Sequence, residues 1–347
     1  MSRNAFRSTL AASAALGAVL AGLAIAPSAG ASGAGSRADW VTSVTATGLI
    51  KLVSPTGEQV TLTSRGAGYE IADVSTDGNR IVLLNTKTNT IAYYDAATKK
   101  RSTFSVAGFD GLGREEVRLT RPTGAEVLVN APRRGMGATP GDLGLDLLRY
   151  DLSGRVTLAL TDVGHALPSV DGKTLVTVSG RQVQIRSNAS GSVARTGPAP
   201  ADACMPSRWW DSGSVQLTCS PGSGLPTYRV GLASGSATLV SNSVDIWTVV
   251  KSPLGTVGFG GQGQCENTSN FGLLKSPSRI SNFALNVPAG YLAEGKAFVG
   301  GYGYYNVLKK SCGLGGSAGV YSYDLLTKQS RKIGNFTNDA VVIDPLR

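Results

Sequence analysis

The sequence predicts an all-β fold, and three observations lead to that prediction. Only 16% of the residues are charged, while glycine occurs 45 times, a composition typical of loop-rich all-β proteins. Six glycines each precede a short apolar run and follow one another at intervals of 40 to 48 residues: Gly78, Gly124, Gly172, Gly213, Gly255 and Gly295. A second set of turn sequences alternates with these glycines. Repeats of about 40 to 50 residues with turns at a fixed phase are typical of β-propeller blades.

The clearest repeat spans residues 70–106. YEIADVS leads into the turn TDGN, and the runs RIVLLN, TIAYYD and RSTFSV follow, with a second turn around Lys99. Four strands joined in this way form one blade. The second run is apolar throughout, as in a strand buried on both faces, whereas the last run alternates, as in an outer strand that is half in water.

The two sets of turns give the number of blades. The six glycines mark inner turns, and the outer turns lie within residues 52–62, 94–104, 150–160, 186–196, 231–241, 274–284 and 323–333. The first outer turn has no inner strand before it, while the tail at 338–345 resembles an inner strand with nothing after it. We therefore predict seven blades in a ring that is closed by the C-terminal strand joining the N-terminal blade. Six blades are the alternative, if the first segment is an added rim strand or the region 290–335 is miscounted.

The beginning of the chain has the pattern of an export signal. Arg3 and Arg7 precede an apolar stretch at 10–26, and Ala29-Gly30-Ala31 follows, so residues 1–31 are predicted to be a cleaved signal peptide. An uncleaved membrane anchor is the alternative. Residues 32–39 are expected to be a flexible start of the mature chain, and 40–347 a single propeller domain. The protein is then a secreted monomer, extracellular or associated with the cell envelope, with no membrane span after cleavage.

The chain is basic. Its formal net charge of +10 becomes +8 when two arginines leave with the signal peptide, which favours anionic partners such as cell-wall polymers over nucleic acid, for which no recognition motif is present. Ring closure places basic residues on the outer parts of three consecutive blades: Lys328, Arg331, Lys332, Lys51, Lys99, Lys100 and Arg101. A role in solubility and in protecting outer strands from edge-to-edge pairing is the alternative.

Four cysteines in an exported chain predict two disulfides. Cys204 and Cys219 lie at equal distances from the turn at 211–212, so a hairpin there places them opposite one another. Cys265 and Cys312 then pair by elimination; free thiols are the alternative. One histidine and no C-x-x-C motif leave no basis for a zinc site.

The repeat resembles that of a known family. VSTDGNRIVLLN with IAYYDAATKK, echoed by SVDGKTLVTV and VYSYDLLTKQ, looks like the S-P-D-G-K repeat of TolB-type, WD40-like β-propellers. The resemblance covers the mature chain, although most copies lack the serine and proline. It implies a fold whose members bind proteins, peptides or ligands rather than sharing one chemistry.

Binding residues are expected on the face that carries the long loops at 130–146, 260–270 and 300–316, together with the loops between blades. The candidates for partner binding are Tyr69, Asp110, Arg114, Arg133, Arg134, His165, Tyr302, Tyr304 and Tyr305. Tyrosine offers a rigid amphipathic surface suited to sugars and proteins. Ordinary rim packing of the tyrosines, and solvated loop positions for the others, are the alternative.

No catalytic residue, cofactor or metal ligand is predicted. The single histidine lies in a loop, and the carboxylates are scattered and mostly in turns. We predict a secreted module that binds a protein, peptide or glycan through the long-loop face. The alternative is a propeller hydrolase or lyase that acts on a polysaccharide or peptide. Convergence of acids, or of His165 with an acid and an arginine, in the central funnel favours the enzyme.

Overall fold

The computed structural model describes residues 39–106, 112–132, 145–219, 226–243, 246, 248–261, 269–309, 316–336 and 341–342. The chain divides into two units after residue 35, and every described residue belongs to the second. The described part contains a single helix, the short 3-10 helix η1 (Arg114–Glu116). No helix in that part has the length and apolar character needed to cross a membrane.

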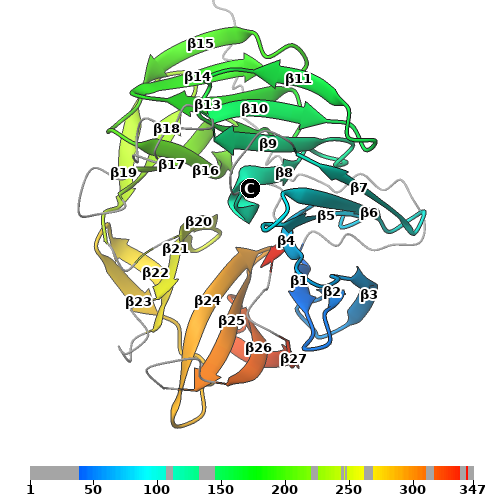
Figure 1. Cartoon of the computed structure of the whole chain (residues 1–347). Coiled ribbons are helices and arrows are strands. Elements are labelled where there is room, and N and C mark those ends of the chain that lie inside the picture. The colour runs from blue at the N-terminus through cyan, green and yellow to red at the C-terminus, as the bar shows by residue number, and fades with distance from the viewer. Residues whose placement is uncertain are drawn as a thin grey trace, which may run out of the picture. The chain divides into compact units, whose positions relative to one another are not determined.

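The described strands form seven sheets of four antiparallel strands, which follow one another around a ring (Figure 1). Blade 1 consists of β28 (Val341–Val342), β1 (Val41–Val44), β2 (Leu49–Val53) and β3 (Gln59–Ser64). Blade 2 consists of β4 (Glu70–Val74), β5 (Arg80–Asn85), β6 (Thr90–Asp95) and β7 (Lys100–Ser105). Blade 3 consists of β8 (Val117–Leu119), β9 (Val127–Pro132), β10 (Leu145–Tyr150) and β11 (Val156–Leu160). Blades 4 and 5 consist of β12 (His165–Pro168), β13 (Thr174–Ser179), β14 (Gln182–Ser187) and β15 (Val193–Pro198); and β16 (Cys204–Asp211), β17 (Ser214–Cys219), β18 (Thr227–Gly231) and β19 (Ala237–Ser241). Blades 6 and 7 consist of β20 (Thr248–Ser252), β21 (Gly255–Gly261), β22 (Ser269–Ser276) and β23 (Arg279–Asn282); and β24 (Tyr291–Val299), β25 (Tyr302–Lys309), β26 (Ser317–Asp324) and β27 (Gln329–Gly334). The predicted seven-bladed β-propeller is confirmed.

The C-terminal strand closes the ring, as predicted. β28 pairs antiparallel with β1, so that Val341 lies opposite Thr42 and Val342 opposite Val41. In Figure 1 the red end of the chain lies beside the blue β1. The first blade therefore takes its innermost strand from the end of the chain, and no inner strand edge is left open there.

The apolar core is divided into seven clusters among the described residues, one at each interface between consecutive blades. Each cluster joins side chains from the two facing sheets. The smallest, between blades 5 and 6, has Trp210, Ile246 and Val249 as its buried members. Because both faces of a blade are covered, its middle strands are apolar on both sides, as the run RIVLLN of β5 shows.

Aspartate shapes the inner turns of blades 2 and 4 in the same way. In blade 4 the Asp171 carboxylate accepts hydrogen bonds from the Ser169 hydroxyl at 2.6 Å and from the Lys173 amide at 3.1 Å. Asp77 accepts the corresponding bonds in blade 2 from Ser75 and Asn79. A serine two residues before such an aspartate therefore has a local structural role, since the two side chains satisfy the turn backbone.

One predicted inner turn is wrong. Gly295 lies within the long strand β24, and the inner turn of blade 7 is formed instead by Gly300 and Gly301, whose φ angles are +59° and +88°. Two consecutive positive φ angles are those of a type I′ hairpin turn, which matches the twist of the flanking strands. The glycine pair, and not the earlier single glycine, thus sets the turn.

We expect Gly172→Ala to lower the free energy of unfolding by about 2–3 kcal/mol, because a β-carbon there combines an unfavourable φ with a clash. The φ of Gly172 is +71°, and the added carbon would lie 2.1 Å from the Arg121 carbonyl oxygen of blade 3. Gly180→Ala is the matched control, since Gly180 has a φ of +55° but open space around it. Urea unfolding of both variants measures the difference, and equal losses would contradict a tight contact between the blades.

The first predicted disulfide is confirmed. Cys204 lies directly opposite Cys219 in the β16–β17 hairpin, and the two sulfurs are bonded. This bond is compatible with a secreted protein. Cys265 and Cys312 lie outside the described residues, as do the predicted signal peptide at 1–31 and residues 32–38.

Candidate functional site

The connections of each blade separate onto two faces of the ring. The turn from the first to the second strand and the turn from the third to the fourth strand lie on one face, here called the turn face. The remaining connections lie on the long-loop face. Asp110, Arg133 and Arg134 lie outside the described residues, so their predicted role in binding stays a prediction.

The expectation that Tyr302, Tyr304 and Tyr305 lie in a loop is wrong. All three belong to strand β25, and both Tyr304 and Tyr305 are 0% exposed. Adjacent residues of a strand point to opposite faces. Tyr304 consequently packs at the interface with blade 1 and Tyr305 at the interface with blade 6. Burial raises the pKa of Tyr304, whose hydroxyl donates to the Asp39 carbonyl oxygen. These two tyrosines are interior packing residues.

The other described candidates lie in different parts of the fold: Tyr69, Arg114 and His165. Tyr69 precedes β4 and is half-buried, with the guanidinium of Arg101 lying 5.1 Å from the centre of its ring. Arg114 is exposed in η1. His165, predicted to lie in a loop, is the first residue of the inner strand β12. Arg101, one of the basic residues predicted on the outer parts of three consecutive blades, thus makes a cation–π contact with Tyr69.

His165 and Arg118 lie on innermost strands of neighbouring blades. Burial lowers the pKa of His165, and the positive charge of Arg118 on β8 lowers it further, so the imidazole is neutral at pH 7. No described carboxylate contributes to this shift. Asp73, an acid on the innermost strand of blade 2, is bound instead by Arg121 at 2.9 Å and by the Leu119 amide at 2.8 Å. The described residues also contain no group of three or more side chains able to hold a metal ion.

A groove lies between blades 4 and 5 and consists of two adjoining cavities. The larger, of about 650 Å³, is lined by Ser169, Val170, Asp171, Thr174, Ile185, Arg195, Trp209, Asp211, Ser212, Gly213, Leu232 and Ala233. The smaller, of about 300 Å³, shares Ile185, Arg195, Leu232 and Ala233 and is completed by Val183, Thr196, Gly197, Pro198, Val230, Gly231, Ser234 and Gly235. Turns of both blades line the groove, so it opens toward the turn face.

Gly197 keeps the smaller cavity open. In two other blades the fifth residue of the outer strand is large, and its side chain packs against a turn glycine of the next blade: Phe104 against Gly154, and Leu160 against Gly191. Gly197 is the fifth residue of β15, and it pairs with Val183 as Phe104 pairs with Ile91 and Leu160 with Leu147. The corresponding turn glycine of blade 5, Gly235, has open space around it, and so does Gly197.

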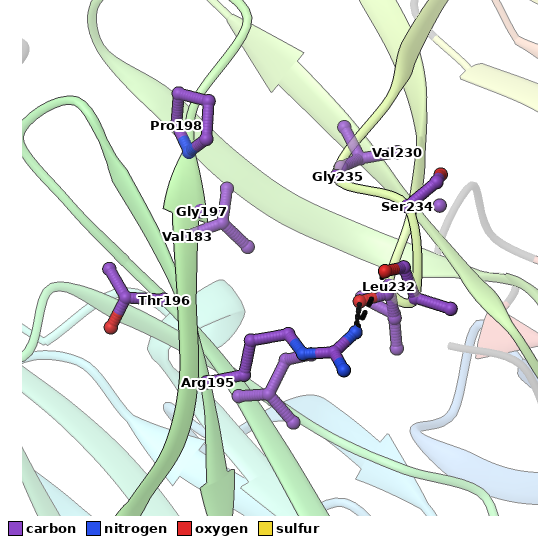
Figure 2. Close-up of a pocket in the computed structure, with 12 residues that line it drawn as sticks. Val183, Arg195, Thr196, Gly197, Pro198, Val230, Leu232, Ser234 and Gly235 are labelled. Atoms are coloured by element: carbon purple, nitrogen blue, oxygen red, sulfur yellow. Dashed lines mark hydrogen bonds between the residues drawn. The ribbon is translucent and has the colours of Figure 1, made fainter.

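Arg195 crosses the groove where the two cavities meet. Its Nη1 donates to the carbonyl oxygens of Leu232 and Ala233, at 2.9 and 2.8 Å. Figure 2 shows the side chain reaching from β15 toward the turn of blade 5, with Gly197 on one side of the opening and Gly235 on the other. The arginine thus bridges blades 4 and 5 where their outer side chains leave a gap.

Two carboxylates line the larger cavity. Hydrogen bonds from the Ser169 hydroxyl and from Lys173 lower the pKa of Asp171. Burial acts to raise the pKa of Asp211, but hydrogen bonds from Ser214 and Gly213 and the charge of Arg229 outweigh it and lower the value overall. Both groups are therefore ionised at neutral pH. Ile185, Leu232 and Val170 provide apolar wall between these acids and Arg195.

This groove is not among the sites predicted from the sequence. Its signal is in the outer strands, because VARTGP has glycine where KRSTFS, VTLAL and QSRKIG have phenylalanine, leucine and isoleucine. Aligning the fourth strands of the repeats would have found the missing side chain. The opening itself also depends on Gly235 of the next blade, which only the ring brings opposite Gly197.

Comparison with known proteins gives matches in structure only. No family model matches the chain, and no curated protein matches its sequence. A prolyl endopeptidase structure has a TM-score of 0.54 and 11% identity, over 89% of this chain and 52% of that one. The acylaminoacyl peptidase of Pyrococcus horikoshii has a TM-score of 0.53 and 10% identity, over 83% and 48%. TolB from Acinetobacter baumannii has a TM-score of 0.45 and 18% identity, over 79% and 61%.

These similarities show the fold alone. The chain spans about half the length of the two peptidases. Membership of the TolB-type family stays a prediction.

Proposed function

We propose that this protein is a secreted binding module that recognises a peptide, protein or glycan without converting it chemically. The groove between blades 4 and 5 is its ligand site. The observation that carries the proposal is Gly197, which leaves open a space beside Arg195 that a large side chain fills at the equivalent position of two other blades. Contacts with a larger partner through the long-loop face, where Tyr69 and Arg114 lie, form part of the same proposal.

The dimensions and chemistry of the groove support binding. Its larger cavity has about 650 Å³, within the range of about 300–1,000 Å³ typical of small-ligand sites. Such sites combine apolar walls with a few placed polar groups, as Ile185 and Leu232 do here with Arg195. An unfilled space between packed elements lowers stability, so a use for the space accounts for its presence.

Hydrolase or lyase activity is the second candidate. His165 and Arg118, on adjacent inner strands, supply two of the three groups that an acid–base site of this kind requires. The described part of the chain supplies no carboxylate that acts on His165. The binding proposal is preferred for that reason.

We expect Gly197→Leu to raise the free energy of unfolding by about 1–2 kcal/mol, because it removes a strand glycine and buries apolar surface. The same change is expected to weaken ligand binding tenfold or more by filling the smaller cavity of the groove, beside Arg195. Saturation-transfer NMR with a library of di- and tripeptides, monosaccharides and disaccharides at millimolar concentration measures binding, and thermal unfolding measures stability.

Gly316→Leu is the matched control, since Gly316 also has open space around it and lies in blade 7, away from the groove. It should retain all binding. The proposal fails if no library member binds the wild-type protein, or if a bound member binds the Gly197→Leu variant equally well.

A further inference from the structure

The guanidinium of Arg195 has donors that the protein does not use. Its two hydrogen bonds both come from Nη1, which leaves Nε and Nη2 without a partner among the described residues. No described carboxylate forms an ion pair with it, in contrast to Arg229, which is paired with Asp211 at 2.9 Å. The edge formed by Nε and Nη2 matches the two oxygens of a carboxylate.

Asp171 supplies the opposite charge in the same cavity. Its Oδ1 accepts both turn hydrogen bonds, and its Oδ2 has no hydrogen-bond partner in the described part of the chain. The other acid of the lining, Asp211, uses Oδ1 for Gly213 and Ser214 and Oδ2 for Arg229. One cation and one anion of the groove are thus free to bind a ligand, and they lie on different elements.

The space between these charges is apolar and of limited extent. Val170, Ile185 and Leu232 line it, and Trp209 covers its inner side, with its indole nitrogen donating to the Pro168 carbonyl oxygen at 2.9 Å. A tripeptide in extended conformation spans about 10 Å, and the cavity of about 650 Å³ has the volume of a small-ligand site.

We infer that the groove binds a free peptide of two or three residues, with the peptide carboxylate on Arg195, its amino group on Asp171 and an apolar side chain between them. The inference rests on the proposed binding function and names its ligand. A fatty acid would satisfy Arg195 but would bury Asp171 against hydrocarbon, which is unfavourable for a charged group. A neutral sugar would leave both charges without a partner.

Isothermal titration calorimetry with three probes tests the inference: the free tripeptide Ala-Leu-Ala, its C-terminal amide and its N-acetyl form. The free peptide is expected to bind the wild-type protein at least tenfold more tightly than either capped form. Arg195→Gln should abolish the difference between the free peptide and the amide, and Asp171→Asn, which keeps the Oδ1 acceptor of the turn, should abolish the difference between the free and acetylated peptides. Arg279→Gln, an exposed change in blade 6, is the control and should preserve both differences.

The outcomes separate the inference from the proposed function. Equal affinity of the free and capped peptides for the wild-type protein overturns the inference, even if Gly197→Leu still blocks their binding. Binding of a library sugar that Gly197→Leu blocks, together with no binding of the tripeptide, also overturns the inference and leaves the proposed function standing. Binding of the tripeptide that Gly197→Leu does not affect overturns both.

Discussion

Deletion of residues 338–347 is expected to abolish the cooperative unfolding transition of the protein. The deletion removes β28, the strand that pairs with β1 and completes blade 1. All four residues of β1 are buried in the closed ring, and without β28 their inner edge presents unpaired backbone groups that invite aggregation. Blade 1 and blade 7 share a core cluster that contains Val41 and Val53. Disruption of blade 1 therefore also destabilises blade 7. Circular dichroism during urea unfolding measures the transition, and size-exclusion chromatography measures aggregation.

A shorter deletion, of residues 345–347, leaves β28 in place and is the control. It should unfold at the wild-type urea concentration. A synthetic peptide of residues 335–347, added during refolding of the longer deletion, should restore the transition by supplying the strand in trans. A wild-type transition in the longer deletion without added peptide would refute closure by β28.

The replacement Asp73→Ala is expected to lower the free energy of unfolding by about 3–5 kcal/mol, because it leaves a buried guanidinium without its counter-charge. Asp73 lies on β4 of blade 2, and Arg121 lies on the inner turn of blade 3; both side chains are 2% exposed. The carboxylate accepts a hydrogen bond from Nη2 of the guanidinium at 3.1 Å and one from the Leu119 amide at 2.8 Å, and Nη1 of the guanidinium lies 2.9 Å from its Oδ2. The pair therefore fixes the relative position of two blades.

The double replacement Asp73→Ala with Arg121→Met removes both charges and should recover most of that loss, since no buried charge remains unpaired. The surface pair Arg181 and Asp202 is the matched control, with side chains that are 77% and 56% exposed. Asp202→Ala is expected to leave Tm unchanged because solvent screens the pair. An Asp73→Ala protein as stable as the wild type would show that the ion pair does not hold the blades together.

The strands and turns of this protein follow from local chemistry, and the sequence predicted most of them. Asp77 and Asp171 bond to their own turn backbone, so these turns need no information from other blades. The mismatch between outer and inner turns predicted both the seventh blade and its closure. The inner turn of blade 7 was predicted wrongly at Gly295, because the Gly300-Gly301 pair five residues later is the stronger turn signal.

The predicted site residues were less accurate, for a physical reason. Tyr304 and Tyr305 alternate with glycine and other tyrosines in the sequence, as residues of a binding loop can, and nothing local shows that a neighbouring blade covers each face of β25. Burial at the interface between blades is decided by residues far away in sequence, such as Val41 for Tyr304 and Phe271 for Tyr305. The burial of β25 becomes evident only when blades 6 and 1 are placed on either side of it.

By itself, the sequence determined the all-β class, the repeat, the blade count, the closing strand and the Cys204–Cys219 pair, because each depends on short-range turn chemistry or on counting repeats. The tertiary structure alone decided where space remains between blades. Gly197 and Gly235 are 38 residues apart in the chain, and nothing in either local sequence shows that the two lie opposite one another. Only the packing of blade 4 on blade 5 turns two missing side chains into one groove, with Arg195 and Asp171 on its walls.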